Sequence, residues 1–479
     1  MKNKLLLLCI IGAINLGQTQ CFDQIYPIDT ATFALKTDGT LWSWGINRQG
    51  VLGTGNPQSA SILYPYQELV SSVDWVKLNH STRTCFGIKA DGTLWAWGSN
   101  GFSSLGSGTS QINMPYSLLP IQIGTDSWLD VSCTGSYTLG VKSDGTLWGW
   151  GRNADSQLAL PTGQPYPVPT QIGTLNTWAK VYTLWSTSFA IKNDGTLWSW
   201  GSPYTYQLGY QATLVTSQIP HQIGTATNWK ELSVPSTRYK MGIKTDGTLW
   251  AWGNNPSQFY NGHYGNGFPD TNDYENGPVQ VGTANNWEAI AATDESAIAI
   301  KTDGTLWAWG YNFLGQLGIG STEPWVATPV QIGNLTNWVK VKSMSNGPSV
   351  NIIKTFAINS DGFAYQWGIT HDELVTIISA YDVPVLFEEL CTLNNMEITT
   401  NDSVVFPNPF SNVLNVLSNG NQIEHVIVYN NLGQIVFEFE VSKNLNEIIN
   451  LNLDFLSSGH YILNLIQKES VSKYLIQKK

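Results

Sequence analysis

The segment Lys142–Gly151, Lys-Ser-Asp-Gly-Thr-Leu-Trp-Gly-Trp-Gly, decides the fold because the chain repeats it. The pattern Lys-x-Asp-Gly-Thr-Leu-Trp-x-Trp-Gly begins at Lys36, Lys89, Lys142, Lys192, Lys244 and Lys301. A degenerate copy begins at Asn359 and keeps Asp361, Gly362 and Trp367 in register. The aspartates of successive copies are 50 to 58 residues apart. A period of this length is typical of a repeat architecture.

Each copy predicts a β-hairpin. Asp-Gly between two apolar runs is a strong turn signal, and both residue types tolerate the positive φ of a type I′ turn. The strand before the turn alternates large and small residues, as in Leu139-Gly140-Val141. Neither face of this strand is polar, so we expect both faces to be covered. The small face leaves room for a bulky neighbour, and we expect the tryptophans after the turn to fill it.

A second recurring segment, Pro-x-Gln-Ile-Gly followed by Trp, precedes the hairpins. It occurs, with one Val for Ile, at Pro120–Trp128, Pro169–Trp178, Pro220–Trp229, Pro278–Trp287 and Pro329–Trp338. The unit is therefore three or four short strands in about 54 residues, the size of a propeller blade. Seven copies predict an all-β, seven-bladed β-propeller.

The tryptophans are better explained by packing than by ligand binding. Of the 21 Trp residues, 13 lie in the hairpin motif and six begin the strand after the Gln-Ile-Gly segment. Only Trp185 and Trp325 stand outside the repeats. A buried indole removes roughly 150–250 Å² from water, so we expect the rings to be wedged between successive sheets.

The composition excludes several classes of protein. Only 12% of the 479 residues are charged, about half the usual share, which argues against a disordered chain or a coiled coil. The net charge of −11 argues against a nucleic-acid partner. Beyond the N-terminus no segment approaches the roughly 18 apolar residues of a membrane span.

Residues 1–20 predict a cleaved secretory signal peptide. Lys2 and Lys4 supply the positive region, and Leu5–Leu16 supply an apolar stretch too short to span a bilayer. Acylation of Cys21, as in a bacterial lipoprotein, is the alternative, but Gln20 is large for the position before such a cysteine.

The strings Asp-Gly-Thr-Leu-Trp-x-Trp-Gly, Pro-x-Gln-Ile-Gly and Asn-x-x-Gly-Gln-Leu-Gly, the last seen at Asn312–Gly318, resemble the regulator of chromosome condensation repeat. The resemblance covers residues 21–391 and implies a seven-bladed propeller, although the third to fifth and seventh copies lose the Gln-Leu-Gly string. Nucleotide exchange, the namesake activity, is not carried over to an acidic chain with a secretory signal. A secreted bacterial propeller of this class inhibits β-lactamases through loops on one face, and this similarity suggests a binding ring.

After a polar linker at residues 392–402, residues 403–479 lack Trp and contain short alternating strands, which predict a small Ig-like β-sandwich. This segment resembles the type A C-terminal sorting domain of type IX secretion substrates. The residues that carry the resemblance as a sorting signal include Pro407, Asn408, Pro409, Gly433 and Gly459. It implies a Bacteroidota-type cell, export through the type IX machinery and removal of the tail. An ordinary adhesin domain is the alternative.

Few residues suggest covalent or metal chemistry. Cys21 opens the first blade and Cys391 closes the last, so we expect a disulfide at the ring junction, and we expect Cys85 and Cys133 to be free buried thiols. The six His residues lack metal-site spacing. Residues 270–275 contain three carboxylates that suggest either a Ca²⁺ site or a solvated acidic loop, and the latter is favoured. We expect no cofactor.

Recognition is expected in residues outside the repeat, because insertions in repeat arrays gather on one face. The candidate ligand-binding residues are Tyr204, Tyr206, Phe259, Tyr260, Tyr264 and Trp325. Rigid aromatics beside Gly and Asn suit contacts with an extracellular protein or a polysaccharide, although loops that pack on themselves would look the same. The prediction is a secreted or surface-bound binding propeller rather than an enzyme. The alternatives are a polysaccharide lyase or hydrolase, and a passive adhesion or surface-layer component.

Overall fold

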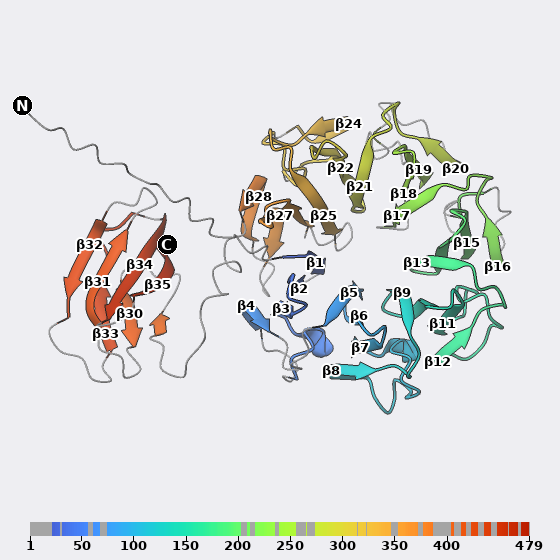
Figure 1. Cartoon of the computed structure of the whole chain (residues 1–479), viewed down its shortest axis with the longest axis horizontal. Helices are drawn as coiled ribbons and strands as arrows, with labels where there is room; N and C mark the ends of the chain where they lie inside the picture. The colour runs from blue at the N-terminus through green and yellow to red at the C-terminus, as the bar shows by residue number, and fades with distance from the viewer. Residues whose placement is uncertain are drawn as a thin grey trace, which may run out of the picture. The chain divides into compact units, whose positions relative to one another are not determined.

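The structure is a computed structural model that describes residues 22–28, 31–55, 61–67, 74–202, 208–210, 216–234, 239–254, 265, 274–313, 315–321, 323–345, 353–371, 377–386, 404–406, 413–417, 423–429, 435–441, 448–457, 459–467 and 471–478. The chain divides into two units, Met1–Cys391 and Thr392–Lys479. The described residues of the first unit form seven antiparallel sheets of four strands each, placed around a common centre (Figure 1). The predicted seven-bladed propeller is confirmed.

Each blade uses four strands that are consecutive in the chain. The first three blades contain β1 (Gln24–Ile28), β2 (Ala31–Leu35), β3 (Leu41–Ile46), β4 (Ser61–Gln67); β5 (Trp75–His80), β6 (Thr84–Lys89), β7 (Leu94–Ser99), β8 (Tyr116–Gln122); β9 (Trp128–Cys133), β10 (Tyr137–Lys142), β11 (Leu147–Gly151) and β12 (Tyr166–Gln171). Two 3₁₀ turns, η1 (Arg48–Gly50) and η2 (Gly101–Ser103), follow β3 and β7. The fourth and fifth blades contain β13 (Trp178–Leu184), β14 (Thr187–Lys192), β15 (Leu197–Gly201), β16 (Ser217–Gln222); β17 (Trp229–Ser233), β18 (Tyr239–Lys244), β19 (Leu249–Asn254) and β20 (Tyr274–Gln280). The last two contain β21 (Trp287–Ala292), β22 (Ser296–Lys301), β23 (Leu306–Tyr311), β24 (Trp325–Gln331); β25 (Trp338–Ser345), β26 (Ile353–Asn359), β27 (Ala364–His371) and β28 (Ile377–Leu386).

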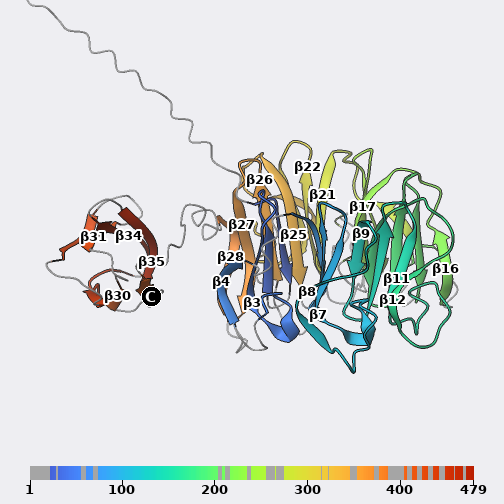
Figure 2. The same ribbon diagram turned by 60° about the horizontal axis from the view of Figure 1, so that its bottom comes forward.

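The strand order gives the ring two different faces. The first strand of each blade lies nearest the centre and the fourth lies at the periphery (Figure 1), and the strands run between the two faces (Figure 2). Because neighbouring strands are antiparallel, the connections from first to second and from third to fourth strand lie on one face, which we call the loop face. The Asp-Gly turns and the connections between blades lie on the other, the turn face.

Hydrogen bonds explain the composition of the hairpin turn. Asp144 Oδ1 accepts hydrogen bonds from the backbone N–H (3.0 Å) and the hydroxyl (2.6 Å) of Thr146, which lower the pKa of Asp144. The Thr146 hydroxyl accepts from Trp148 Nε1 at 2.8 Å, and Lys142 Nζ lies 3.4 Å from the centroid of the Trp148 ring. The same Asp–Thr–Trp contacts recur in the repeats of Asp38, Asp91, Asp194, Asp246 and Asp303.

The predicted type I′ turn is wrong. Gly145 has a φ of 83°, but Asp144 is not among the residues with positive φ. Gly145 donates its N–H to the Lys142 carbonyl at 2.9 Å, and Lys142 donates its N–H to the Thr146 carbonyl at 3.0 Å. These two backbone bonds define a loop of three residues with glycine in the left-handed position.

In the second, third and fifth blades, the tryptophan that begins the first strand fills the small face of the second strand. A Cβ atom at Gly140 would lie 2.5 Å from Cζ3 of Trp128 and 3.4 Å from Cη2 of Trp150. The space beside Gly140 is thus filled mainly by the Trp128 ring, which precedes the hairpin in the same blade. The expectation that tryptophans after the turn fill this face is corrected accordingly, since Trp150 is the second neighbour.

In the second, third and fourth blades, the second Trp of the hairpin joins two blades. The Trp367 N–H of the seventh blade has no acceptor among the described residues. Trp150 is fully buried and donates its indole N–H to the Ser104 carbonyl of the preceding blade at 2.8 Å. Trp97 and Trp200 make equivalent bonds to Val51 and Gln157, also at 2.8 Å. These contacts confirm the expected wedging of indoles between sheets. By contrast, within the part of the chain that the structure describes, six buried first-strand indoles donate to no acceptor: Trp75, Trp128, Trp178, Trp229, Trp287 and Trp338.

Side chains cap the free inner edges of the blades. An unpaired strand edge leaves backbone N–H groups that require acceptors. Asp130 Oδ2 accepts from the Val181 N–H of the next blade at 2.9 Å, and Ser132 Oγ accepts from the Thr183 N–H at 3.0 Å. Tyr182 and Ser233 act similarly on the fifth and sixth blades. These bonds connect the innermost strands of successive blades.

The ring closes between the first and last blades through side chains. Phe22 and Ile25 pack with Phe356 in one buried cluster. Lys340 of β25 forms an ion pair with Asp23 and donates to its carbonyl oxygen at 2.7 Å. The predicted Cys21–Cys391 disulfide lies outside the described residues and stays a prediction.

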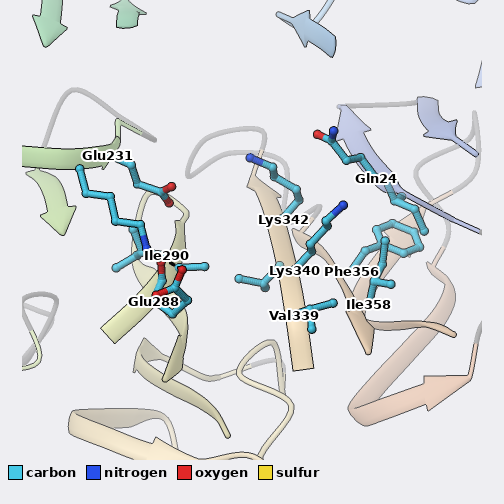
Figure 3. Close-up of a pocket in the computed structure, with 13 residues that line it drawn as sticks. Gln24, Glu231, Glu288, Ile290, Val339, Lys340, Lys342, Phe356 and Ile358 are labelled. Atoms are coloured by element: carbon cyan, nitrogen blue, oxygen red, sulfur yellow. Dashed lines mark hydrogen bonds and ion pairs between the residues drawn. The ribbon is translucent and has the colours of Figure 1, made fainter. Parts of the chain in front are cut away.

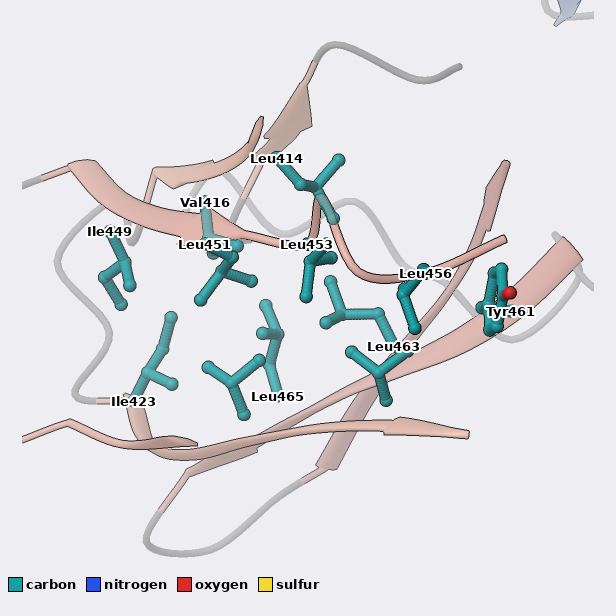
Figure 4. Close-up of a cluster of buried hydrophobic side chains, with 12 residues drawn as sticks. Leu414, Val416, Ile423, Ile449, Leu451, Leu453, Leu456, Tyr461, Leu463 and Leu465 are labelled. Atoms are coloured by element: carbon teal, nitrogen blue, oxygen red, sulfur yellow. The ribbon is translucent and has the colours of Figure 1, made fainter. Parts of the chain in front are cut away.

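The second unit is a sandwich of two sheets. Its strands are β29 (Val404–Phe406), β30 (Val413–Leu417), β31 (Ile423–Tyr429), β32 (Ile435–Glu440), β33 (Ile448–Asn452), β34 (Gly459–Gln467) and β35 (Val471–Lys478). The sheet orders are β29-β30-β33 and β32-β31-β34-β35. Apolar residues of both sheets, such as Leu414, Val416, Val426, Leu463 and Leu465, form the core between them (Figure 4). The predicted small Ig-like sandwich is confirmed.

Candidate functional site

Most of the predicted ligand-binding residues lie outside the described residues. Tyr204 and Tyr206 belong to the segment between β15 and β16, and Phe259, Tyr260 and Tyr264 belong to the segment between β19 and β20. The described strands that these segments connect end at the loop face. Their role in binding therefore stays a prediction.

Trp325 begins β24 at the loop face. It is partly buried and pairs in register with Tyr311 of β23. The two rings have centroids 4.7 Å apart, and the Tyr311 ring is parallel within 8° to that of Phe313 at 6.3 Å. Phe313 is 68% exposed. Trp325 therefore belongs to a group of three aromatic residues on the sixth blade, together with Tyr311 and Phe313.

Trp185 is a surface residue to which the sequence assigned no role. It lies in the turn between β13 and β14 on the loop face, and its side chain is 73% exposed. Its φ of 43° lies in the left-handed region, which disfavours a bulky side chain. The available sequence signal was that Trp185 does not belong to the repeat.

Contacts connect the turn that carries Trp185, through its neighbour Ser186, to a second exposed aromatic residue. Phe102, in η2, is 42% exposed and has a φ of 55°. The Arg152 guanidinium carbon lies 5.6 Å from the Phe102 ring centroid, and Arg152 forms a 3.2 Å ion pair with Asp155. Asp155 accepts a 2.9 Å hydrogen bond from the Ser186 hydroxyl. We call Phe102, Arg152, Asp155 and Trp185 the Trp185 patch; it spans three blades of the loop face.

The Trp185 patch combines two exposed aromatic rings with an Arg–Asp ion pair. Exposed Trp, Phe and Arg are the residue types enriched at protein interfaces. Across the described ranges, no group of three His, Cys, Asp or Glu residues comes together as a metal site. Nor do those ranges contain a helix long and apolar enough to cross a membrane.

Cys85 and Cys133 are free and buried, as predicted, and burial raises the pKa of both thiols. Of the residues assigned to the sorting signal, Gly459 begins β34. The others, Pro407, Asn408, Pro409 and Gly433, lie outside the described residues.

Comparisons with known families agree with both units. Residues 91–141, 144–191 and 303–350 match the regulator of chromosome condensation (RCC1) repeat, as do residues 128–157 and 287–316 with a second form of it. Residues 404–478 match the secretion system C-terminal sorting domain.

Individual relatives are distant. The human E3 ubiquitin-protein ligase HERC2 is 24% identical over 346 residues, which are 71% of this chain and 6% of HERC2. The ultraviolet-B receptor UVR8 of Arabidopsis thaliana is 25% identical over 294 residues, 59% of this chain and 63% of UVR8. The chain therefore spans less than two thirds of either relative.

Two solved structures share the fold. Prp20p from Saccharomyces cerevisiae has a TM-score of 0.59 and 15% identity, covering 81% of this chain and 90% of Prp20p. Human WBSCR16 also has a TM-score of 0.59, with 18% identity, covering 72% of this chain and 94% of WBSCR16. The chain is a seven-bladed propeller that contains RCC1 repeats, followed by a type IX C-terminal sorting domain, which is typical of proteins secreted to the cell surface or outside.

Proposed function

We propose that the protein is a binding ring that acts outside the cell and engages a protein partner through its loop face. Residues 1–20 direct the chain across the inner membrane, and the sorting domain then directs it through the type IX machinery and is removed. The ring carries out no catalytic step in this proposal.

The observation that supports this proposal is the combination of exposure and backbone strain at Trp185. A left-handed backbone costs a residue with a Cβ atom roughly 1–2 kcal/mol, and glycine avoids that cost. An indole that is 73% exposed recovers little of it by burial within the ring. Contact with a partner would recover it, because Trp and Arg are frequent interface anchors.

A protein partner is favoured over a glycan by the makeup of the Trp185 patch. Arg152 is held between the Phe102 ring and Asp155, so its guanidinium is positioned beside an aromatic face. This arrangement suits a partner with a carboxylate and an apolar side chain. Prp20p, which shares the fold, has binding properties toward Gsp1p and histones.

Affinity measurements on surface variants test the proposal. Extracellular proteins captured by the full chain would be identified, and the affinity of each would be measured for Trp185→Gly and Phe102→Ala. We expect both changes to weaken the partner by about tenfold or more. Ile219→Ala is the matched control, because Ile219 is an equally apolar side chain, 61% exposed on the outer strand β16.

Two outcomes would contradict the proposal. Unchanged affinity in both patch variants would remove the Trp185 patch as the binding surface. A glycan array that retains the protein through Trp185, without any protein partner that depends on this residue, would replace the protein partner by a polysaccharide.

A further inference from the structure

The central channel contains a cavity that is separate from the loop-face patch. Its volume is about 280 Å³, and it is lined by the innermost strands β1, β17, β21 and β25 together with β26 (Figure 3). The polar lining residues are Gln24, Lys230, Glu231, Glu288, Lys340 and Lys342. A cavity of this size accommodates a small ligand.

Most polar groups of the cavity are already satisfied. Lys230 forms a 2.6 Å ion pair with Glu288, and Lys340 is paired with Asp23. Gln24 donates to Asp23 at 3.0 Å through its amide. These ion pairs and this hydrogen bond already satisfy the polar groups involved, so these groups do not require a ligand.

Two opposite charges in the lining have no such partner. Among the described residues, neither Glu231 nor Lys342 forms an ion pair within 4 Å, although both line the same cavity. Figure 3 shows Lys342 extending from β25 toward the side on which Glu231 lies, while Lys340 extends toward Gln24. The carboxylate and the ammonium therefore face one cavity from different blades.

The surroundings of Lys342 favour an added carboxylate. Lys342 is exposed to solvent within the ring. Desolvation by the surrounding strands lowers its pKa, which Glu231 opposes and the ammonium groups of Lys77 and Lys340 reinforce. An anion placed beside Lys342 would offset this positive field. The same anion would be repelled by Glu231. A ligand with only a negative charge would therefore gain attraction to Lys342 but meet repulsion from Glu231.

We propose that the cavity binds a small zwitterion, in the chemical class of free amino acids. Its carboxylate accepts hydrogen bonds from Lys342, and its ammonium group donates to Glu231. Each contact is a charge-assisted hydrogen bond in a confined space. Two of the blades that line the cavity are joined, because Ser233 Oγ accepts a hydrogen bond from the Ala292 N–H at 3.0 Å.

Calorimetric titration of the full chain tests the proposal with defined probes. Glycine, β-alanine and 4-aminobutyrate present the two charges at increasing separations, and acetate and methylammonium present one charge each. We expect one of the three zwitterions to bind about tenfold or more tightly than either single-charge probe. Equal affinity for acetate, or no heat from any zwitterion at roughly 10 mM, would overturn the zwitterion site.

Variants assign the binding to the two charges. We expect Glu231→Gln and Lys342→Met each to weaken the zwitterion by about tenfold or more. The double variant Glu231→Lys/Lys342→Glu should retain binding, because the zwitterion can bind in the reverse orientation. Lys180→Met is the control: Lys180 is a channel lysine that does not line the cavity. Unchanged affinity in both single variants would overturn the assignment even if the exchanged protein fails to fold.

Discussion

Replacing one indole by a phenyl ring at two positions of the third blade tests how the blades are joined. Trp128→Phe and Trp150→Phe remove the same atoms from two buried sites, 3% and 0% exposed. They differ in one respect. Trp150 donates its N–H to the Ser104 carbonyl of the preceding blade at 2.8 Å, whereas the Trp128 N–H has no acceptor among the described residues.

The difference in stability follows from this hydrogen bond. Both changes lose packing, which costs roughly 1–2 kcal/mol for a partly truncated aromatic ring. Trp150→Phe also loses a net hydrogen bond of about 1 kcal/mol; Ser104 keeps a second donor, the Thr138 hydroxyl at 3.0 Å. Trp128→Phe instead removes an unsatisfied buried donor, which recovers about 1 kcal/mol. We expect Trp150→Phe to lower the free energy of unfolding by about 2 kcal/mol more than Trp128→Phe.

Tryptophan emission during urea unfolding measures this difference on the full chain. All 21 tryptophans lie at or before Trp367, so the emission reports on the ring and not on the sorting domain. Equal losses for the two variants, or a larger loss for Trp128→Phe, would show that the bond to Ser104 does not join the blades as inferred.

Three further predictions address other parts of the molecule. Trp185→Gly should leave the free energy of unfolding unchanged or raise it by up to about 1 kcal/mol, since glycine adopts a φ of 43° without strain; a clear loss in urea unfolding would mean that the indole packs on the ring. Burial lowers the pKa of His80 to about 3, from about 6.5 in an unfolded chain. The unfolded state therefore takes up a proton as the pH falls from 6.5 toward 3 while the folded ring does not, and stability falls over this window. His80→Gln should remove that part of the fall, and parallel pH profiles for parent and variant would contradict it. Deletion of residues 404–479 should retain the ring inside the cell, and its appearance in the medium at parental levels on cell fractionation would argue against type IX export.

The repeat made the ring predictable because each motif residue acts through near neighbours in the chain. Asp144, Thr146 and Trp148 are bonded to one another within five residues, so their spacing carries the turn. What failed was the detail that depends on other strands. The contact of Trp128 with Gly140 requires the register of β9 against β10, which shifts between Val141 and Lys142. The spacing of residues within one motif does not reveal this register shift.

The candidate sites were less accessible to sequence reasoning. Counting repeats separated Trp185 and Trp325 from the packing tryptophans, but it could not tell which of them is exposed. The exposure of Trp185 depends on a tight turn between β13 and β14. The channel cavity is more remote still, because Glu231 and Lys342 come from the fifth and seventh blades and meet only when the ring is closed.

In the closed ring, the residues that stabilise the fold and the residues proposed to bind ligands occupy different positions. Repeated residues occupy the space between sheets, where Trp97, Trp150 and Trp200 bond to the preceding blade. Residues on the loop face and in the channel carry little of this packing. Trp185 and Lys342 can therefore differ from their counterparts in other blades without opening a cavity between sheets. The two sites also use different elements, turns for the Trp185 patch and inner strands for the cavity. A change at Trp185 should accordingly leave amino-acid binding in the channel intact, and a change at Lys342 should leave the loop-face partner bound.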